Sequence, residues 1–190
     1  MNAFESQLRL IRRLQVHSKL ASLGLHKKIL ASFPNPLHKE SVTNCHAKCK
    51  FGHKESSSWA RRPEGRLVAD RLYTLLTRMY SKAVIDRNLN EFELLEVYNV
   101  YKALYPKDEI SPTRIYYFNP KIRSGDLIVK PHCSKCRKSF ITHFQDQAKL
   151  CGSCKIVEKE ASKAKKLASL NAPSEGNNPA EETLKTANSG

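Results

Sequence analysis

The sequence lacks several features that would place it in a common functional class. It has no apolar run long enough to cross a bilayer, and its N-terminus has no continuous apolar core like that of a secretory signal peptide. The phosphate-binding glycine loop, the GxSxG elbow and the HExxH helix are also missing. We therefore expect a protein that does not insert in a membrane and is not an enzyme.

Acidic residues are scarce. Lys and Arg number 33 against 18 Asp and Glu, so the formal net charge is +15. Residues 172–190 hold three of the acids and a single lysine, so the remainder is more basic still. A folded unit with this charge repels itself and favours a polyanionic partner, which indicates nucleic acid. The alternative is a solvated basic surface without such a partner.

Four of the six cysteines form two Cys-x-x-Cys pairs, Cys133 with Cys136 and Cys151 with Cys154. A disulfide framework needs an oxidising compartment, so metal binding is the better interpretation. Each pair can form a tight turn that presents two thiolates, and Gly152 can supply left-handed backbone there. We predict one structural zinc ion per chain, held by four thiolates in a closed tetrahedral site. Two redox-active dithiols are the alternative.

Charged residues flank both pairs and would offset the negative charge of four thiolates. The two nearby histidines, His132 and His143, are expected at the surface or behind the ligands rather than among them. The flanking cations are Lys135, Arg137, Lys138, Lys149 and Lys155.

A second group of potential ligands lies earlier in the chain, in a segment that we predict to be an irregular connection. It contains Cys45, His46, Cys49 and His53 within nine residues. So short a segment closes a tetrahedral site only with strain. A second metal site and free cysteines in a loop both remain open.

The apolar periodicity predicts a mainly α fold, with a helical N-terminal domain and a small zinc-ribbon-like C-terminal module. Near the N-terminus, helices over Phe4–Leu23 and Leu25–Phe33 flank Gly24, which suggests a helix-turn-helix-like unit or an ordinary helical hairpin. Further helices are expected over 66–83, 88–105 and 155–170. Another helix should begin at Ser111-Pro112 and be interrupted at Asn119-Pro120. We expect β-structure at 127–129 and 140–143.

Composition and patterning suggest four segments. We expect a helical domain for DNA and partner binding at 1–126, the four-cysteine module at 127–157, a basic helix at 158–171 and a disordered tail at 172–190. The first thirty residues are amphipathic and basic, with only Glu5 as an acid, so by composition alone they could form a mitochondrial transit peptide.

The cysteine region resembles the zinc region of the FlhC family. The resemblance rests on Cys-Ser-Lys-Cys-Arg-Lys-Ser-Phe-Ile-Thr-His from Cys133 to His143, followed by Cys-Gly-Ser-Cys at Cys151–Cys154. It covers roughly residues 5–170 and is strongest at the cysteines. Weaker similarity extends over Ser58-Trp59 to Leu76, Val97 to Pro106, Thr113-Arg114 and Ser124-Gly125-Asp126-Leu127. The segment from Cys45 to His53 and the Asn119-Pro120 pair depart from the family pattern and suggest a divergent branch.

The resemblance implies a bacterial, cytoplasmic, nucleoid-associated activator of transcription, which removes the transit-peptide interpretation. Its implied partners are double-stranded DNA, a smaller helical FlhD-like protein in a hetero-oligomer, and RNA polymerase. The implied targets are flagellar operons (flagellum biogenesis) or the transfer genes of conjugative elements. An RNA- or ribosome-binding zinc-ribbon protein is the alternative, since it would share the charge and the four cysteines.

A DNA-binding subunit would contact phosphates through lysine and arginine, so its affinity should fall steeply with salt. Base-edge contacts and DNA bending would supply specificity. The candidate DNA-binding residues are Lys27, Lys28, Arg61, Arg62, Lys135, Arg137 and Lys138.

Overall fold

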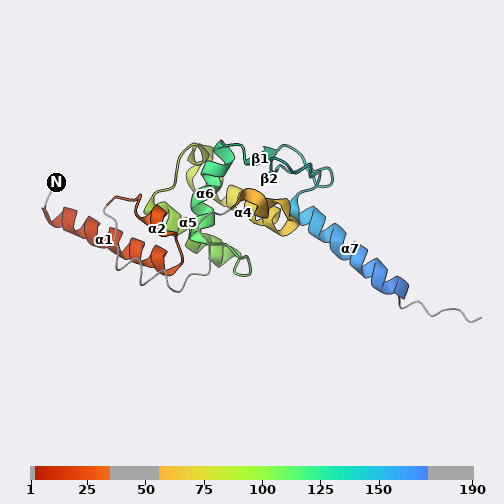
Figure 1. Ribbon diagram of the computed structural model, residues 1–190, viewed down its shortest axis with the longest axis horizontal. Coiled ribbons are helices and arrows are strands. Elements are labelled where there is room, and N and C mark those ends of the chain that lie inside the picture. The colour runs from red at the N-terminus through yellow and green to blue at the C-terminus, as the bar shows by residue number, and fades with distance from the viewer. Residues whose placement is uncertain (1–2, 35–55, 171–190) are drawn as a thin grey trace, which may run out of the picture. The chain divides into compact units, whose positions relative to one another are not determined.

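The computed structural model describes residues 3–34 and 56–170 and is mainly helical, with one two-stranded sheet (Figure 1). The chain divides into two compact units after Val157. The first unit holds the helical body, residues 3–34 and 56–126, and the metal module, residues 127–154. No helix of the described ranges combines the length and the apolar character needed to span a membrane. The predicted mainly α fold with a small four-cysteine module is confirmed.

The two N-terminal helices are present. Helix α1 (Ala3–Ser22) ends before Gly24, whose φ of 91° reverses the chain. Helix α2 (Lys27–Leu30) is a single turn, shorter than the predicted Leu25–Phe33, because His26 is extended and its side chain caps the helix at Lys28. The end of α1 and the α2 region bury Leu20, Leu25 and Leu30 in the core.

Helix α4 (Pro63–Tyr80) follows the short 3-10 helix η1 (Ser57–Arg61). Pro63, at the first position, has no backbone N–H that would need a partner there, and its ring favours the helical φ. Helix α4 therefore starts earlier than the predicted residue 66. Four apolar residues of α4 are buried in the main core, namely Val68, Leu72, Leu75 and Leu76. The helix ends at Tyr80, short of the predicted residue 83.

Helix α5 (Glu91–Leu104) follows the 3-10 helix η2 (Lys82–Asp86). Its start is set by a capping box, in which the Asn90 side chain accepts from the backbone N–H of Glu93 and Glu93 accepts from that of Asn90. Leu94, Val97 and Tyr101 are fully buried, so α5 contributes a second apolar face to the core.

Helix α6 (Pro112–Arg123) begins as predicted, with Ser111 accepting from the backbone N–H of Arg114. The prediction that Asn119-Pro120 interrupts this helix is wrong, since it continues to Arg123. Asn119 is fully buried, and its side-chain amide donates to the carbonyls of Val84 (2.7 Å) and Arg87 (3.1 Å). These bonds hold α6 against η2 and offset the backbone bond that a helical proline removes.

Strands β1 (Leu127–Lys130) and β2 (Phe140–His143) confirm the predicted β-structure. They pair antiparallel with Leu127 opposite His143 and Lys130 opposite Phe140. Helix α7 (Gly152–Leu170) starts directly after Cys151 and contains Cys154, so its first turn belongs to the metal module. From Glu158 to Ala168 its residues are in the second unit, and all of them are exposed.

Candidate metal centre

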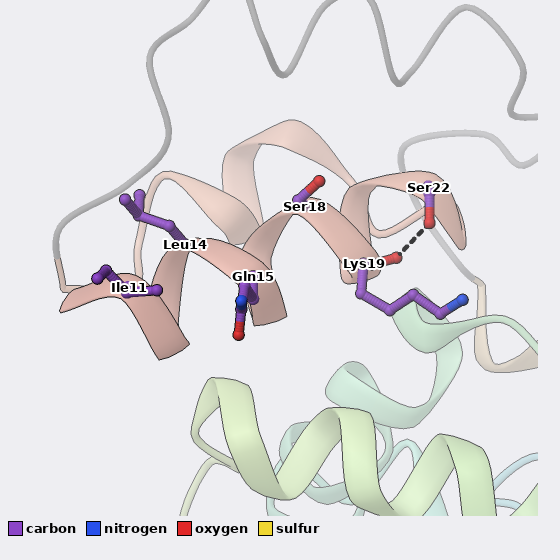
Figure 2. A pocket seen from close by; sticks show the side chains of 6 residues that line it. All are labelled: Ile11, Leu14, Gln15, Ser18, Lys19 and Ser22. Atoms are coloured by element: carbon purple, nitrogen blue, oxygen red, sulfur yellow. Dashed lines mark hydrogen bonds between the residues drawn. The ribbon is translucent and has the colours of Figure 1, made fainter. Parts of the chain in front are cut away.

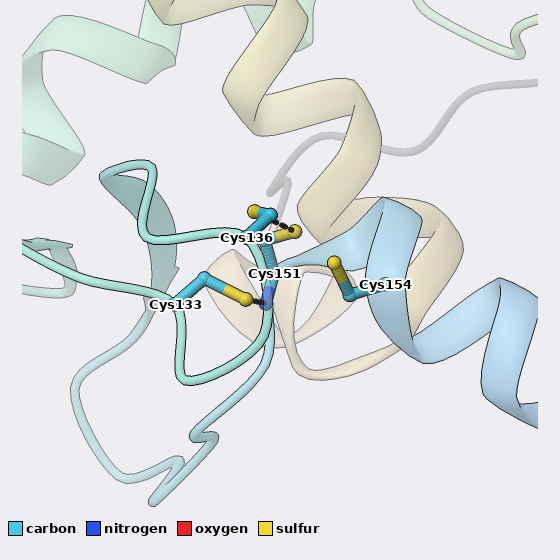
Figure 3. A group of neighbouring side chains, drawn as sticks. All are labelled: Cys133, Cys136, Cys151 and Cys154. Carbon is cyan, nitrogen blue, oxygen red and sulfur yellow. Dashed lines mark hydrogen bonds between the residues drawn. The ribbon is translucent and has the colours of Figure 1, made fainter.

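The four predicted cysteines come together in the metal module. Cys133 and Cys136 lie in the turn that follows β1, Cys151 immediately precedes α7, and Cys154 is in its first turn. Figure 3 shows their side chains converging, and the four sulfur atoms all lie within 4.8 Å of one another. The Sγ atoms of Cys136 and Cys151 are 3.7 Å apart, too far for a disulfide bond. The group can hold a metal ion such as zinc.

The first pair is shaped by a tight turn. The backbone N–H of Arg137 donates to the carbonyl of Cys133 (2.9 Å), and the N–H of Cys133 donates to the carbonyl of Lys138 (2.8 Å). Arg137 has a φ of 63° and therefore supplies the left-handed backbone of this turn. A non-glycine side chain in this region costs conformational energy, which the turn's hydrogen bonds offset.

The prediction that Gly152 supplies left-handed backbone is wrong. Gly152 starts α7 and is not among the glycines with positive φ. It is required for a different reason, close packing: a Cβ there would lie 2.3 Å from the backbone N of Leu67 and 2.5 Å from the carbonyl oxygen of Pro63. The start of α7 thus packs directly against the backbone of α4.

The thiols of Cys133, Cys151 and Cys154 differ in how readily they ionise. Burial opposes the charge on Cys133, but backbone N–H groups of Cys136, Cys151 and Lys135 donate to its sulfur and bring its pKa down to about 6. Burial raises the pKa of Cys151 to about 12 and also raises the pKa of Cys154. Gathering four thiolates here is therefore unfavourable without a cation, and a bound metal ion would stabilise all four.

The apolar core of the metal module is small. Its separate cluster consists of buried Cys133, Phe140 and Cys151 with Ala148 and Leu150 packed against them, because Leu127 and Ile141 of the hairpin join the core of the helical body. Two of the three buried residues are themselves candidate ligands, so little apolar surface is left to hold the module together. A metal ion would therefore supply much of its stability.

The module is fixed to α4 by polar contacts. Asp70 accepts a hydrogen bond from the backbone N–H of Ile141 at 2.6 Å and another from that of Gly152. Arg66, which is buried, pairs with Asp146 at 2.5 Å. These contacts join one face of α4 to β2, to the turn that follows β2, and to the start of α7.

Burial raises the pKa of Asp70 to about 7, against the lowering effect of the Ile141 N–H and of Arg66. No sequence motif marked Asp70, Arg66 or Asp146 as part of the site. The partners in the Asp70–Ile141 bond are 71 residues apart, and those in the Arg66–Asp146 pair are 80 apart. A weak signal was available in Asp70 itself, a carboxylate inside an otherwise apolar and basic stretch of helix.

The two nearby histidines lie outside the sulfur cluster. The Nδ1 atom of His132 is 3.2 Å from the carbonyl oxygen of Arg137, and the Nδ1 atom of His143 accepts from the backbone N–H of Gln145. Neither belongs to the potential metal-binding group of the described residues. Cys45, His46, Cys49 and His53 lie outside the described residues, as does the predicted disordered tail.

The candidate DNA-binding residues fall in two places. Lys135, Arg137 and Lys138 are exposed on the first cysteine turn. Arg61 joins this region, because its guanidinium donates to the side chain of Gln145 just after β2. Arg62, next to it, is exposed at the start of α4.

The other place is α2, where Lys27 and Lys28 are exposed. Helices α5 and α6 lie between α2 and the β1–β2 hairpin in Figure 1. The structure therefore brings five of the seven candidates to the metal module or its edge and leaves two apart.

Comparison with known proteins adds no assignment to this site. A scan against protein-family models finds no match, and a search of curated proteins finds no relative.

Proposed function

We propose that the chain holds one structural zinc ion and is the DNA-binding subunit of an FlhC-like transcriptional activator. The observation that carries the proposal is the group of four converging sulfurs with exposed Lys135, Arg137 and Lys138 beside them, on a chain of net charge +15. The FlhC-like sequence around these cysteines supports the family assignment. Four thiolates leave no open coordination position for a substrate, so the role of the metal is to hold structure.

The choice of zinc follows from the ligands. Thiolates favour soft and borderline metals, and a four-sulfur tetrahedral arrangement suits zinc. In this proposal the thiols are ligands and not redox dithiols. Metal analysis separates the two: one zinc per chain with four thiols that resist alkylation supports the proposal, whereas zinc-free protein with reactive thiols contradicts it.

The charges of the metal module suggest how DNA would be bound. Exposed cations on a turn that the metal holds rigid can contact phosphates in a fixed arrangement, which positions the protein on the duplex. Arg61 and Arg62 extend this basic surface to the start of α4. Because α4 is anchored to the module, such contacts would orient the helical body toward an FlhD-like partner and RNA polymerase at flagellar or transfer-gene promoters.

The decisive experiment compares promoter-upstream DNA with total RNA as ligands of the purified zinc-loaded chain and its FlhD-like partner. We expect a saturable footprint on DNA of defined sequence and an affinity that falls steeply with salt. Binding to RNA without a DNA footprint would instead support the ribosome-associated alternative.

Variants locate the contact surface. Replacing Lys135, Arg137 and Lys138 by glutamine should lower the slope of log affinity against log salt by about 1 for each phosphate contact removed. The matched control replaces Arg78, Lys82 and Lys107, three exposed cations of the helical body, by glutamine. Unchanged zinc content and an unchanged circular dichroism spectrum show that each variant is folded. Equal slopes for the two sets would place DNA elsewhere.

A further inference from the structure

The first three turns of α1 project from the core. Every residue from Phe4 to Arg12 is exposed, and the first buried residue of α1 is His17. Among these exposed residues are Phe4, which is 65% exposed, and Ile11, which is 51% exposed. Large side chains of this kind are costly to leave in water when they gather on one helix.

Three of the exposed apolar residues share a face. Phe4, Leu8 and Ile11 are spaced by four and three residues, so they line one side of a helix with a period of 3.6. The buried residues of α1, His17, Leu20 and Ala21, lie on the other side. The exposed face runs into a shallow hollow (Figure 2) lined by Ile11, Leu14, Gln15, Ser18, Lys19 and Ser22.

A projecting helix of this length is only marginally stable in water. Isolated helices shorter than about 12–15 residues gain too little from backbone hydrogen bonds to offset the cost of nucleation. Packing of an apolar face normally supplies the difference, and within the described part of the chain nothing covers Phe4, Leu8 or Ile11. Both observations indicate a binding surface for another helix.

The charges on α1 select the chemistry of that helix. Arg12 and Lys19 lie along one edge of the apolar face, Arg9 is farther round, and Glu5 is the only acid on α1. A second copy of the chain would bring two such basic edges together, with a net charge of +15 on each copy opposing association. An acidic helix would meet opposite charges along the same edge.

We propose that the exposed face of α1 binds an acidic amphipathic helix of a different protein. Apolar residues of that helix would cover Phe4, Leu8 and Ile11, while its carboxylates pair with Arg12 and Lys19. The proposal names a surface for the helical partner included in the proposed function, and it rests on that function only for the existence of the partner.

The test uses the zinc-loaded full chain and two synthetic amphipathic helices about as long as α1. Both carry leucines at helical spacing, and glutamates flank them in one peptide and lysines in the other. By calorimetry we expect saturable one-to-one binding of the acidic peptide, at least about tenfold tighter than that of the basic peptide. Equal binding of both peptides, or of neither, overturns the proposal.

Matched variants locate the surface. Leu8→Ser and Ile11→Ser together should weaken binding of the acidic peptide by at least about tenfold. Leu10→Ser is the control, because Leu10 is 43% exposed against 42% for Leu8 but points away from the face. Arg12→Gln with Lys19→Gln should remove the preference for the acidic peptide. An equal loss in the Leu10 control would contradict the assigned face.

Sedimentation of the chain alone tests the rival occupant. Self-association that Leu8→Ser and Ile11→Ser abolish would assign the face to a second copy and overturn the proposal, whereas a monomer supports it. DNA binding measured on the same preparation keeps the two proposals separate. If the unaltered chain binds DNA but not the acidic peptide, only the α1 surface is rejected. If it binds the acidic peptide but not DNA, only the DNA-binding function is rejected.

Discussion

The helical body and the metal module are stabilised in different ways within one compact unit. The body has a continuous apolar core that includes fully buried Leu72, Leu76, Leu94 and Ile115. The separate buried cluster of the module holds only Cys133, Phe140 and Cys151, while Leu127 and Ile141 of its hairpin join the core of the body. Its four sulfurs cannot all ionise side by side without a cation. The difference indicates that side-chain packing holds the body together, whereas a bound metal ion would stabilise the module.

The junction between these two regions is held together by polar and backbone contacts. Asp70, Arg66 and the close approach of Gly152 connect the module to α4 through hydrogen bonds, an ion pair and backbone contact. Loss of a bound metal ion should therefore weaken the contacts at this face of α4. Removal of the Asp70 and Arg66 contacts should loosen the module while its sulfurs stay together.

The largest expected effect is removal of a ligand. Cys151→Ala should abolish tight metal binding, whose free energy is on the order of 10–16 kcal/mol for structural zinc in small peptides. Elemental analysis should find the variant metal-free, and hydrogen exchange should be fast at β1 and β2 but slow at α5. Ser153→Ala, at an exposed neighbouring position, is the control and should keep its metal. If β1 and β2 stay protected without metal, the comparison fails.

A cavity in the helical body should lower the stability of the body and leave metal binding intact. Leu72→Ala removes a fully buried side chain and should lower the free energy of unfolding by about 2–5 kcal/mol. Urea unfolding followed by circular dichroism measures the loss, and metal content under native conditions should be unchanged. Leu104, 57% exposed, gives the control Leu104→Ala, with an expected change within about 0.5 kcal/mol.

Breaking the junction should have a smaller effect. Asp70→Ala leaves the backbone N–H groups of Ile141 and Gly152 without their acceptor, at a cost of about 1–3 kcal/mol. We expect faster exchange of the Ile141 amide with metal still bound. Asp86→Ala removes an exposed carboxylate of the body and should leave this amide protected. Equal exchange in both variants would show that Asp70 does not anchor the module.

Acid should weaken the module more than the body. The pKa of Cys151, raised to about 12, means that this thiol must release a proton when it binds metal at neutral pH. Each such proton lowers metal affinity about tenfold, about 1.4 kcal/mol, for every pH unit of acidification. The fall should steepen below pH 6, where Cys133 also takes up a proton. Competition with a chelator at several pH values measures it, and a flat profile would rule out thiolate ligation.

Much of the fold could be predicted from local patterns. The apolar spacing of α4 and α5, the Ser111-Pro112 start of α6 and the two short strands were all visible, because each depends on residues close together in the chain. The four-cysteine group was predictable for the same reason, since each Cys-x-x-Cys pair closes its own turn. The course of α6 past Pro120 was not, because the compensating bonds from Asn119 reach η2, more than thirty residues away.

The sequence by itself determined that four sulfurs would share one site and that a strongly basic surface would surround them, since spacing and charge are properties of the chain. Only the tertiary structure decided what holds that site in place and which apolar face of α1 stays exposed. Asp70 meets Ile141 across 71 residues, Gly152 is required by the backbone of α4, and one side of α1 packs while the other does not. Such contacts depend on how distant segments fold onto one another, which local periodicity does not encode.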